Sequence, residues 1–134
     1  MQTLRNSLFL LLTAAFLIAC SPNSTPEKAA QNYIDTILAN DIDGLMDTLY
    51  FPDGADAEER SLVRGKLTIL LAETSTRTIS MGGVKDVSYS KTEYNEDKTR
   101  ANIGVTIHYK REDAPVKTEN IALRKTDKGW KVSL

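Results

Sequence analysis

The chain has 134 residues, and its 17 Lys and Arg against 18 Asp and Glu give a formal net charge of −1 at pH 7. The opposite charges are interspersed and form no basic run, which argues against nucleic acid as a partner. A chain of this length can bury one hydrophobic core but not two, so we expect one domain. The single cysteine excludes an intramolecular disulfide, and together with a single histidine it leaves no zinc-binding set, so we predict no metal site.

The first nineteen residues have the composition of a signal peptide. Arg5 supplies a positive charge, and residues 8–19 form an apolar run. This run is about a dozen residues long, whereas a transmembrane helix needs about 20. Ala19 has the small side chain that signal cleavage requires, and the thiol of Cys20 follows it directly. We therefore expect residues 1–19 to be removed.

The tetrapeptide Leu17-Ile18-Ala19-Cys20 resembles the lipobox of bacterial lipoproteins. The resemblance implies cleavage between Ala19 and Cys20, with a diacylglycerol and an N-acyl chain on Cys20 as the only added groups. Each buried CH₂ contributes about 0.8 kcal/mol, so two or three acyl chains would anchor the protein stably in the bacterial cell envelope. In Gram-negative relatives, a residue such as Ser21 after the lipidated cysteine implies the outer membrane, on its periplasmic or surface face. The alternative is an ordinary signal peptide with a free Cys20 thiol.

Local signals predict three helix starts after the leader. Thr25-Pro26 combines a capping side chain with a proline suited to the first helical position. Asn40-Asp41 is expected to end this helix and to cap a short second one. A third helix is expected near Asp56, with Glu59 three residues later as in a capping box. Gly82-Gly83 would stop it.

From residue 84 onward the hydrophobic period changes to two, which is typical of strands. The clearest strand places on one face Ala101, Ile103, Val105, Ile107 and Tyr109. Shorter alternating runs predict three further strands around residues 84–90, 121–123 and 130–134. One apolar and one polar face indicate an antiparallel sheet. The predicted fold class is α+β, with about three N-terminal helices packed on a curled four-stranded sheet in a cone-like arrangement.

Three stretches carry a family resemblance. They are Thr25-Pro26-Glu27 running into Tyr33, the alternating strand Ala101–Tyr109, and the closing Lys125-Thr126-Asp127-Lys128-Gly129-Trp130-Lys131-Val132. Through them residues 26–134 resemble the single domain of small bacterial lipoproteins in the nuclear-transport-factor-2-like (cystatin-like) superfamily. The resemblance implies a pocket between sheet and helices, which in this superfamily serves isomerases, dehydratases, ligand binders and interaction surfaces. Residues 20–25 then form the lipidated cysteine and a tether of at most about 18 Å.

Side chains with an apolar body and a polar tip could line such a pocket. The candidates are Tyr33, Tyr50, Tyr89, Tyr109 and Trp130. Their alternative role is that of ordinary core and rim residues. By strand parity His108 belongs to the solvent face, whereas Glu119 shares the parity of Ile121 and could point inward or lie at a solvated strand end. No inward acid–base pair is evident, so we predict no catalytic residue.

These observations favour a membrane-anchored envelope lipoprotein whose domain is a non-enzymatic binding or interaction module, with an envelope protein as its partner. One alternative is a carrier of a small apolar ligand in the cone, and a second is an isomerase-like or dehydratase-like pocket enzyme. A cavity of roughly 300 Å³ or more would favour the carrier over the interaction module. The sequence indicates no oligomeric state.

Overall fold

The computed structural model describes residues 21–134, so the predicted signal peptide, Ala19 and Cys20 lie outside the described residues. Helices come first and strands follow, in the predicted order. The elements are α2 (Pro26–Leu38), α3 (Ile42–Thr48), α4 (Ala57–Ser80), β1 (Val84–Tyr89), β2 (Glu93–Tyr94), β3 (Arg100–Tyr109), β4 (Lys117–Thr126) and β5 (Gly129–Val132). Within this part of the chain, no helix has both the length and the apolar character that crossing a bilayer requires.

The first two helices begin at side-chain caps, as the sequence predicts. The Thr25 hydroxyl accepts a hydrogen bond from the backbone N–H of Lys28 at 3.2 Å. The carboxylate of Asp41 accepts one from the N–H of Gly44 at 3.0 Å. Each cap satisfies a donor that the first turn of a helix leaves without an intrahelical partner.

The start of α4 is a complete capping box. The Asp56 carboxylate accepts from the N–H of Glu59 at 2.8 Å, and the Glu59 carboxylate accepts from the N–H of Asp56 at 3.3 Å. The helix then runs for 24 residues. It stops before Gly82 and Gly83, whose positive φ angles of 81° and 93° favour glycine and break the helical path.

The strands form one antiparallel sheet in the order β1-β3-β4-β5, with β2 paired to β3. The predicted four strands are present, and the two-residue β2 is a fifth that is too short to produce a periodic signal. The predicted last strand is wrong at its end, because β5 stops at Val132 and Leu134 is exposed. Ser133 donates its N–H to the carbonyl of Ala122 at 2.8 Å, and 74% of Leu134 is exposed beyond this bond.

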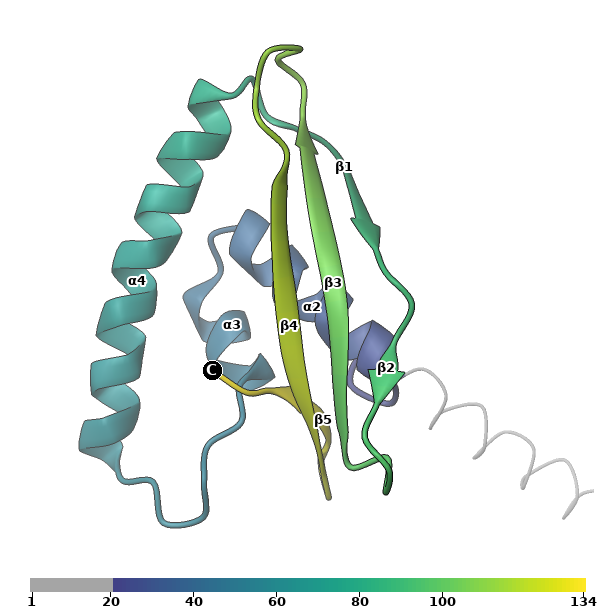
Figure 1. Cartoon of the computed structure of the whole chain (residues 1–134). Helices are drawn as coiled ribbons and strands as arrows, with labels where there is room; N and C mark the ends of the chain where they lie inside the picture. Colours follow the sequence, from purple (N-terminus) through teal and green to yellow (C-terminus); the bar gives the residue numbers. More distant parts are fainter. Residues whose placement is uncertain (1–20) are drawn as a thin grey trace, which may run out of the picture.

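One face of the sheet supplies most of the core. Its buried side chains are Ala101, Ile103, Val105, Ile107, Tyr109, Ile121, Leu123, Trp130 and Val132. The helices bury their apolar faces against it, chiefly through Ile34, Leu45 and Leu71. Figure 1 shows α4 and the sheet as two flanks that converge at one end, with α3 between them and α2 crossing behind β4 and β3. This is the predicted α+β cone.

Two contacts hold the converging end together. The backbone N–H of Arg111 donates to the carbonyl of Met81 at 3.1 Å, and the Arg111 guanidinium donates to the carbonyl of Ser80 at 3.0 Å. They join the end of α4 to the turn between β3 and β4. We call this region the turn end, and the opposite end of β3, where the β4–β5 hairpin lies, the hairpin end.

Candidate functional site

The space between helices and sheet narrows to a small pocket near the turn end. This cone pocket has a volume of about 80 Å³. It is lined by Tyr33, Ile34, Ile37 and Leu38 of α2, Leu70 and Thr74 of α4, and Ile107, Tyr109, Lys117 and Glu119 of the sheet. A ligand site normally offers about 300 Å³ or more, so buried side chains already fill most of the cone.

Strand β4 brings two charges to the rim of the cone pocket. Glu119 has the parity of buried Ile121 and points inward, and Lys117 lies two residues before it on the same face. The Lys117 ammonium lies 2.8 Å from the Glu119 carboxylate, with 29% and 42% of the two side chains exposed. An ion pair this accessible to water contributes little to stability. It does, however, balance the charge of the one carboxylate that faces the pocket.

Tyr33 is the titratable group most affected by this environment. Burial raises the pKa of the Tyr33 hydroxyl above 10.0, and the negative charge of Glu119 raises it further. The phenol therefore stays protonated at neutral pH and can act as a hydrogen-bond donor. It has no charge with which to abstract a proton.

The five aromatic pocket candidates separate in the structure. Tyr33 and Tyr109 line the cone pocket, whereas Tyr50 lies in a different groove near the hairpin end. Trp130 is buried in the core, where its ring meets that of Tyr94 edge to face with centroids 6.1 Å apart. Tyr89 lies outside the cone pocket, and burial followed by the charge of Asp35 raises its pKa.

His108 lies on the other face of the sheet, as its parity predicts. Its Nδ1 atom is 2.8 Å from the Asp86 carboxylate, and the two residues are direct cross-strand partners on β3 and β1. The sheet separates this pair from the cone pocket. Among the described residues, no group of three or more His, Cys, Asp or Glu side chains could hold a metal ion.

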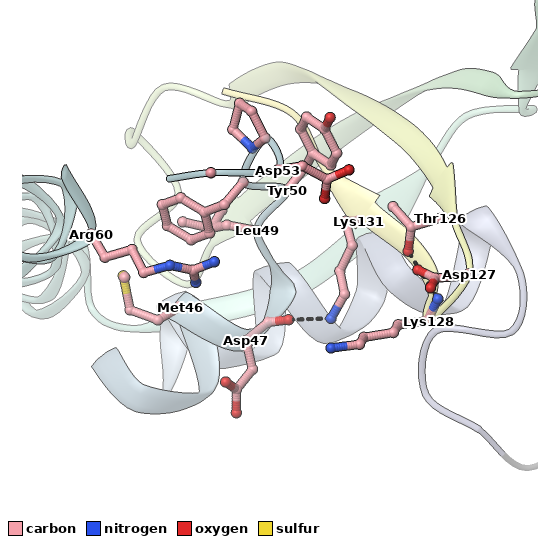
Figure 2. Close-up of a pocket in the computed structure, with 13 residues that line it drawn as sticks. Met46, Asp47, Leu49, Tyr50, Asp53, Arg60, Thr126, Asp127, Lys128 and Lys131 are labelled. Carbon is pink, nitrogen blue, oxygen red and sulfur yellow. Dashed lines mark hydrogen bonds between the residues drawn. The ribbon is translucent and has the colours of Figure 1, made fainter. Parts of the chain in front are cut away.

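A wider groove opens at the hairpin end, and sequence patterns gave no signal for it. This hairpin groove has a volume of about 600 Å³ and joins the α3–α4 connection to the β4–β5 hairpin (Figure 2). Its charged side chains are Asp47, Asp53, Arg60, Asp127, Lys128 and Lys131. The Lys131 ammonium donates to the backbone carbonyl of Asp47 at 2.6 Å, which ties the hairpin to α3.

Stacked cations order the aromatic side chains between α3 and α4. The Arg60 guanidinium lies 4.4 Å from the ring centre of Phe51, and that of Arg124 lies 4.4 Å from the ring centre of Tyr50. The N–H of Tyr50 also donates to the carbonyl of Val132 at 2.7 Å. The groove therefore has ordered walls, and its lining mixes charged side chains with apolar ones.

The third candidate is the solvent side of α4. Leu62 and Ile69 are exposed to 61% and 63%, two turns apart, with Gly65 between them. A Cβ atom added to Gly65 would meet nothing within 4 Å. We call these three residues the outer face of α4, and they lie in a shallow hollow of the helix surface that Glu58, Ser61 and Lys66 also line.

The three-helix cone on a curled antiparallel sheet defines a nuclear-transport-factor-2-like (NTF2-like) domain. More specifically, the chain belongs to the family described as domain of unknown function DUF4878, whose family model matches residues 18–133. The family resemblance seen in the sequence is thus confirmed at the level of the fold. No curated protein matches the sequence.

Solved structures share this fold. A "putative NTF2-like transpeptidase" from Campylobacter jejuni is 29% identical, with a TM-score of 0.73 over 83% of this chain and 99% of that chain. A "putative calcium/calmodulin-dependent protein kinase type II association domain" from Thiobacillus denitrificans is 14% identical, with a TM-score of 0.57 over 84% and 92% of the two chains. The second likeness concerns the fold alone.

Proposed function

We propose that this protein is a lipid-anchored protein of the bacterial envelope whose NTF2-like domain is a non-enzymatic interaction module. The observation that carries the second half of this proposal is the volume of the cone pocket. About 80 Å³ accommodates a few water molecules rather than a small apolar ligand. A carrier that holds an apolar ligand inside the cone therefore lacks the space it needs, and we assign recognition to the surface of the domain.

The distribution of polar groups supports a role without catalysis. Glu119, the carboxylate at the cone pocket, is solvated and paired with Lys117. The raised pKa of Tyr33 leaves no second group there that is ready to accept a proton. The pocket holds a donor in Tyr33 and a carboxylate in Glu119, but the pairing of that carboxylate with Lys117 and the pocket volume of about 80 Å³ favour a role without catalysis.

The transpeptidase named in the Campylobacter jejuni structure raises a separate possibility. Acyl transfer of that kind needs a nucleophile with a base within hydrogen-bond reach. Residues 21–134 contain no cysteine, and their single histidine, His108, is engaged by Asp86 on the outer sheet face. We therefore do not carry that activity over to this chain.

The outer face of α4 is the surface we assign to a protein partner in the envelope. A glycine in a helix interior costs about 1 kcal/mol relative to alanine, and no contact within this domain explains Gly65. Gly65 has no side chain, so the backbone of a partner can approach α4 closely at this position. The exposed side chains of Leu62 and Ile69 would then pack on either side of the partner's backbone. An apolar ridge of another envelope protein fits this shape.

The test is site-specific photocrosslinking in the native envelope. A photoreactive residue at Leu62 or Ile69 of the full-length protein should give one defined crosslinked product. The same residue at Thr118, exposed on the outer face of the sheet, should not. Gly65→Leu should remove the product at Ile69. Crosslinks that are equal at all three positions, or an apolar small molecule retained in native mass spectrometry, would refute the interaction module.

The lipid anchor has its own test. Wild-type cells given labelled palmitate should incorporate it into this protein, because Cys20 is the acceptor in this proposal. Cys20→Ala should carry no label and should remain as an unprocessed precursor. Equal labelling of the two proteins would show that the Cys20 assignment is wrong.

A further inference from the structure

The residues that follow Cys20 pack against the domain instead of forming a free linker. The backbone N–H of Trp130 donates to the carbonyl of Asn23 at 2.9 Å. The N–H of Ser24 donates to the carbonyl of Ser21 at 3.2 Å, which folds the segment into a turn. This bond from Trp130 lies on the side of β5 that does not face β4, and it holds the tether to the β4–β5 hairpin.

Gly129 makes this contact possible. Its φ of 98° lies in the left-handed region that glycine favours. A Cβ atom at this position would come within 2.6 Å of the Asn23 carbonyl oxygen. Because Gly129 has no Cβ, the hairpin can accept the tether backbone at close range. Two residues after Asn23, the Thr25 side chain caps the start of α2.

The attachment point lies at the hairpin end of the cone. Lys125 donates its N–H to the carbonyl of Thr99 at 2.8 Å, which places the β2–β3 turn beside the β4–β5 hairpin. Figure 1 shows the start of α2 beside β2 at this end, away from the β3–β4 turn. The ten residues of β3 separate the two ends by roughly 30 Å.

We infer that the hairpin end is the membrane-facing surface of the protein, and that lipid headgroups are its partner. This inference rests on the lipid anchor proposed above. Cys20 precedes the pinned Asn23 by three residues, so its acyl chains attach within about 10 Å of the hairpin. The bilayer surface must then lie against the β4–β5 hairpin and the β2–β3 turn, with the turn end directed away from it.

The surface chemistry of the hairpin end suits headgroups that carry both charges. The β2–β3 turn presents Glu96, Asp97 and Lys98, and the hairpin presents Asp127 and Lys128. The hairpin groove opens at the same end and also mixes cations with carboxylates. Phosphate and ammonium groups of zwitterionic lipids would both find partners here. Because the net charge of the chain is only −1, we assign the affinity for the membrane to the acyl chains. The short tether then sets the orientation of the domain on the bilayer.

Fluorescence quenching on vesicles tests this orientation. The full lipidated chain has no free thiol, so single cysteines at Glu96, Lys128 and Glu112 can each carry one fluorophore. Glu96 and Lys128 lie at the hairpin end, and Glu112 lies at the turn end; all three are exposed. The vesicles are phosphatidylethanolamine with a fraction of lipids that carry a nitroxide on the headgroup. We expect quenching at Glu96→Cys and Lys128→Cys and none at Glu112→Cys.

A linker insertion provides the matched control. Twelve Gly and Ser residues between Ser21 and Pro22 add a segment whose ends average about 20 Å apart. The insertion breaks the turn between Ser21 and Ser24 but keeps the bond from Trp130 to Asn23 and the Thr25 cap, so the domain keeps its fold. We expect it to remove the quenching at Glu96→Cys and Lys128→Cys while the protein stays on the vesicles.

The outcomes separate this inference from the proposed function. Equal quenching at the three positions, or quenching that the insertion does not change, would overturn the orientation and leave the lipid anchor intact. If the wild-type full-length protein carries no palmitate and does not stay on the vesicles, the proposed lipid anchor is wrong. The membrane orientation inferred from it is then wrong as well.

Discussion

The substitution Gly65→Ala should make the isolated domain more stable. Gly65 lies in the middle of the 24-residue helix α4, and an added Cβ would meet nothing within 4 Å. Alanine therefore gains the full difference in helix propensity, about 1 kcal/mol, without steric cost. For a domain of this size the corresponding rise in Tm is about 4 °C.

The assay is urea unfolding of residues 21–134, followed by the fluorescence of Trp130, the single tryptophan of the chain. Trp130 is buried, so its emission should change when the core opens. A higher midpoint with an unchanged slope would show a gain in stability without a change in the surface that unfolding exposes.

Gly44→Ala is the matched control with the opposite sign. Gly44 is also helical, but a Cβ there would collide with the carboxylate of its own cap, Asp41, and press on Thr36. Loss of such a cap costs about 0.5–2 kcal/mol. If Gly65→Ala is neutral or destabilising while Gly44→Ala behaves as expected, the outer face of α4 is not open in the isolated domain. A partner surface at Gly65 would then be ruled out.

Two further substitutions test the interior. Trp130→Ala should cost about 3–5 kcal/mol in the free energy of unfolding, because it empties a buried position; an unchanged melting temperature by circular dichroism would contradict this. Tyr33→Phe should flatten the alkaline pH dependence of stability. Above pH 10.0 the unfolded chain releases the Tyr33 proton while the folded protein keeps it, so wild-type stability falls as pH rises towards the folded pKa. Glu119→Gln should weaken the same dependence, and parallel curves for wild type and Tyr33→Phe would show that burial does not act on this hydroxyl.

Local chemistry made much of the fold predictable from the sequence. The capping side chains of Thr25, Asp41 and Asp56 each bind a backbone N–H three residues later. Because the two partners are so close in the chain, their sequence spacing is enough to predict the contact. The alternation along β3 likewise assigns each side chain to one face, which correctly put His108 outside. By the same rule Glu119 lies on the cone side of β4, where it forms part of the exposed rim of the cone pocket.

Other features could not be predicted because they depend on segments that are far apart in the chain. Strand β2 has only two residues and exists because Tyr94 pairs with Ala101 beside Trp130. The hairpin groove needs the α3–α4 connection to lie against β5. No local pattern reports either contact.

The sequence by itself determined where the helices begin, which face of each long strand is apolar and the order of helices before sheet, since these follow from interactions between near neighbours in the chain. Only the tertiary structure decided how completely the cone is filled. The cone pocket volume is a difference between the space enclosed and the side chains that occupy it, and both depend on how α2, α4 and the sheet approach one another. The contact between Asn23 and the β4–β5 hairpin has the same origin: its two partners are more than a hundred residues apart, and packing alone brings them together.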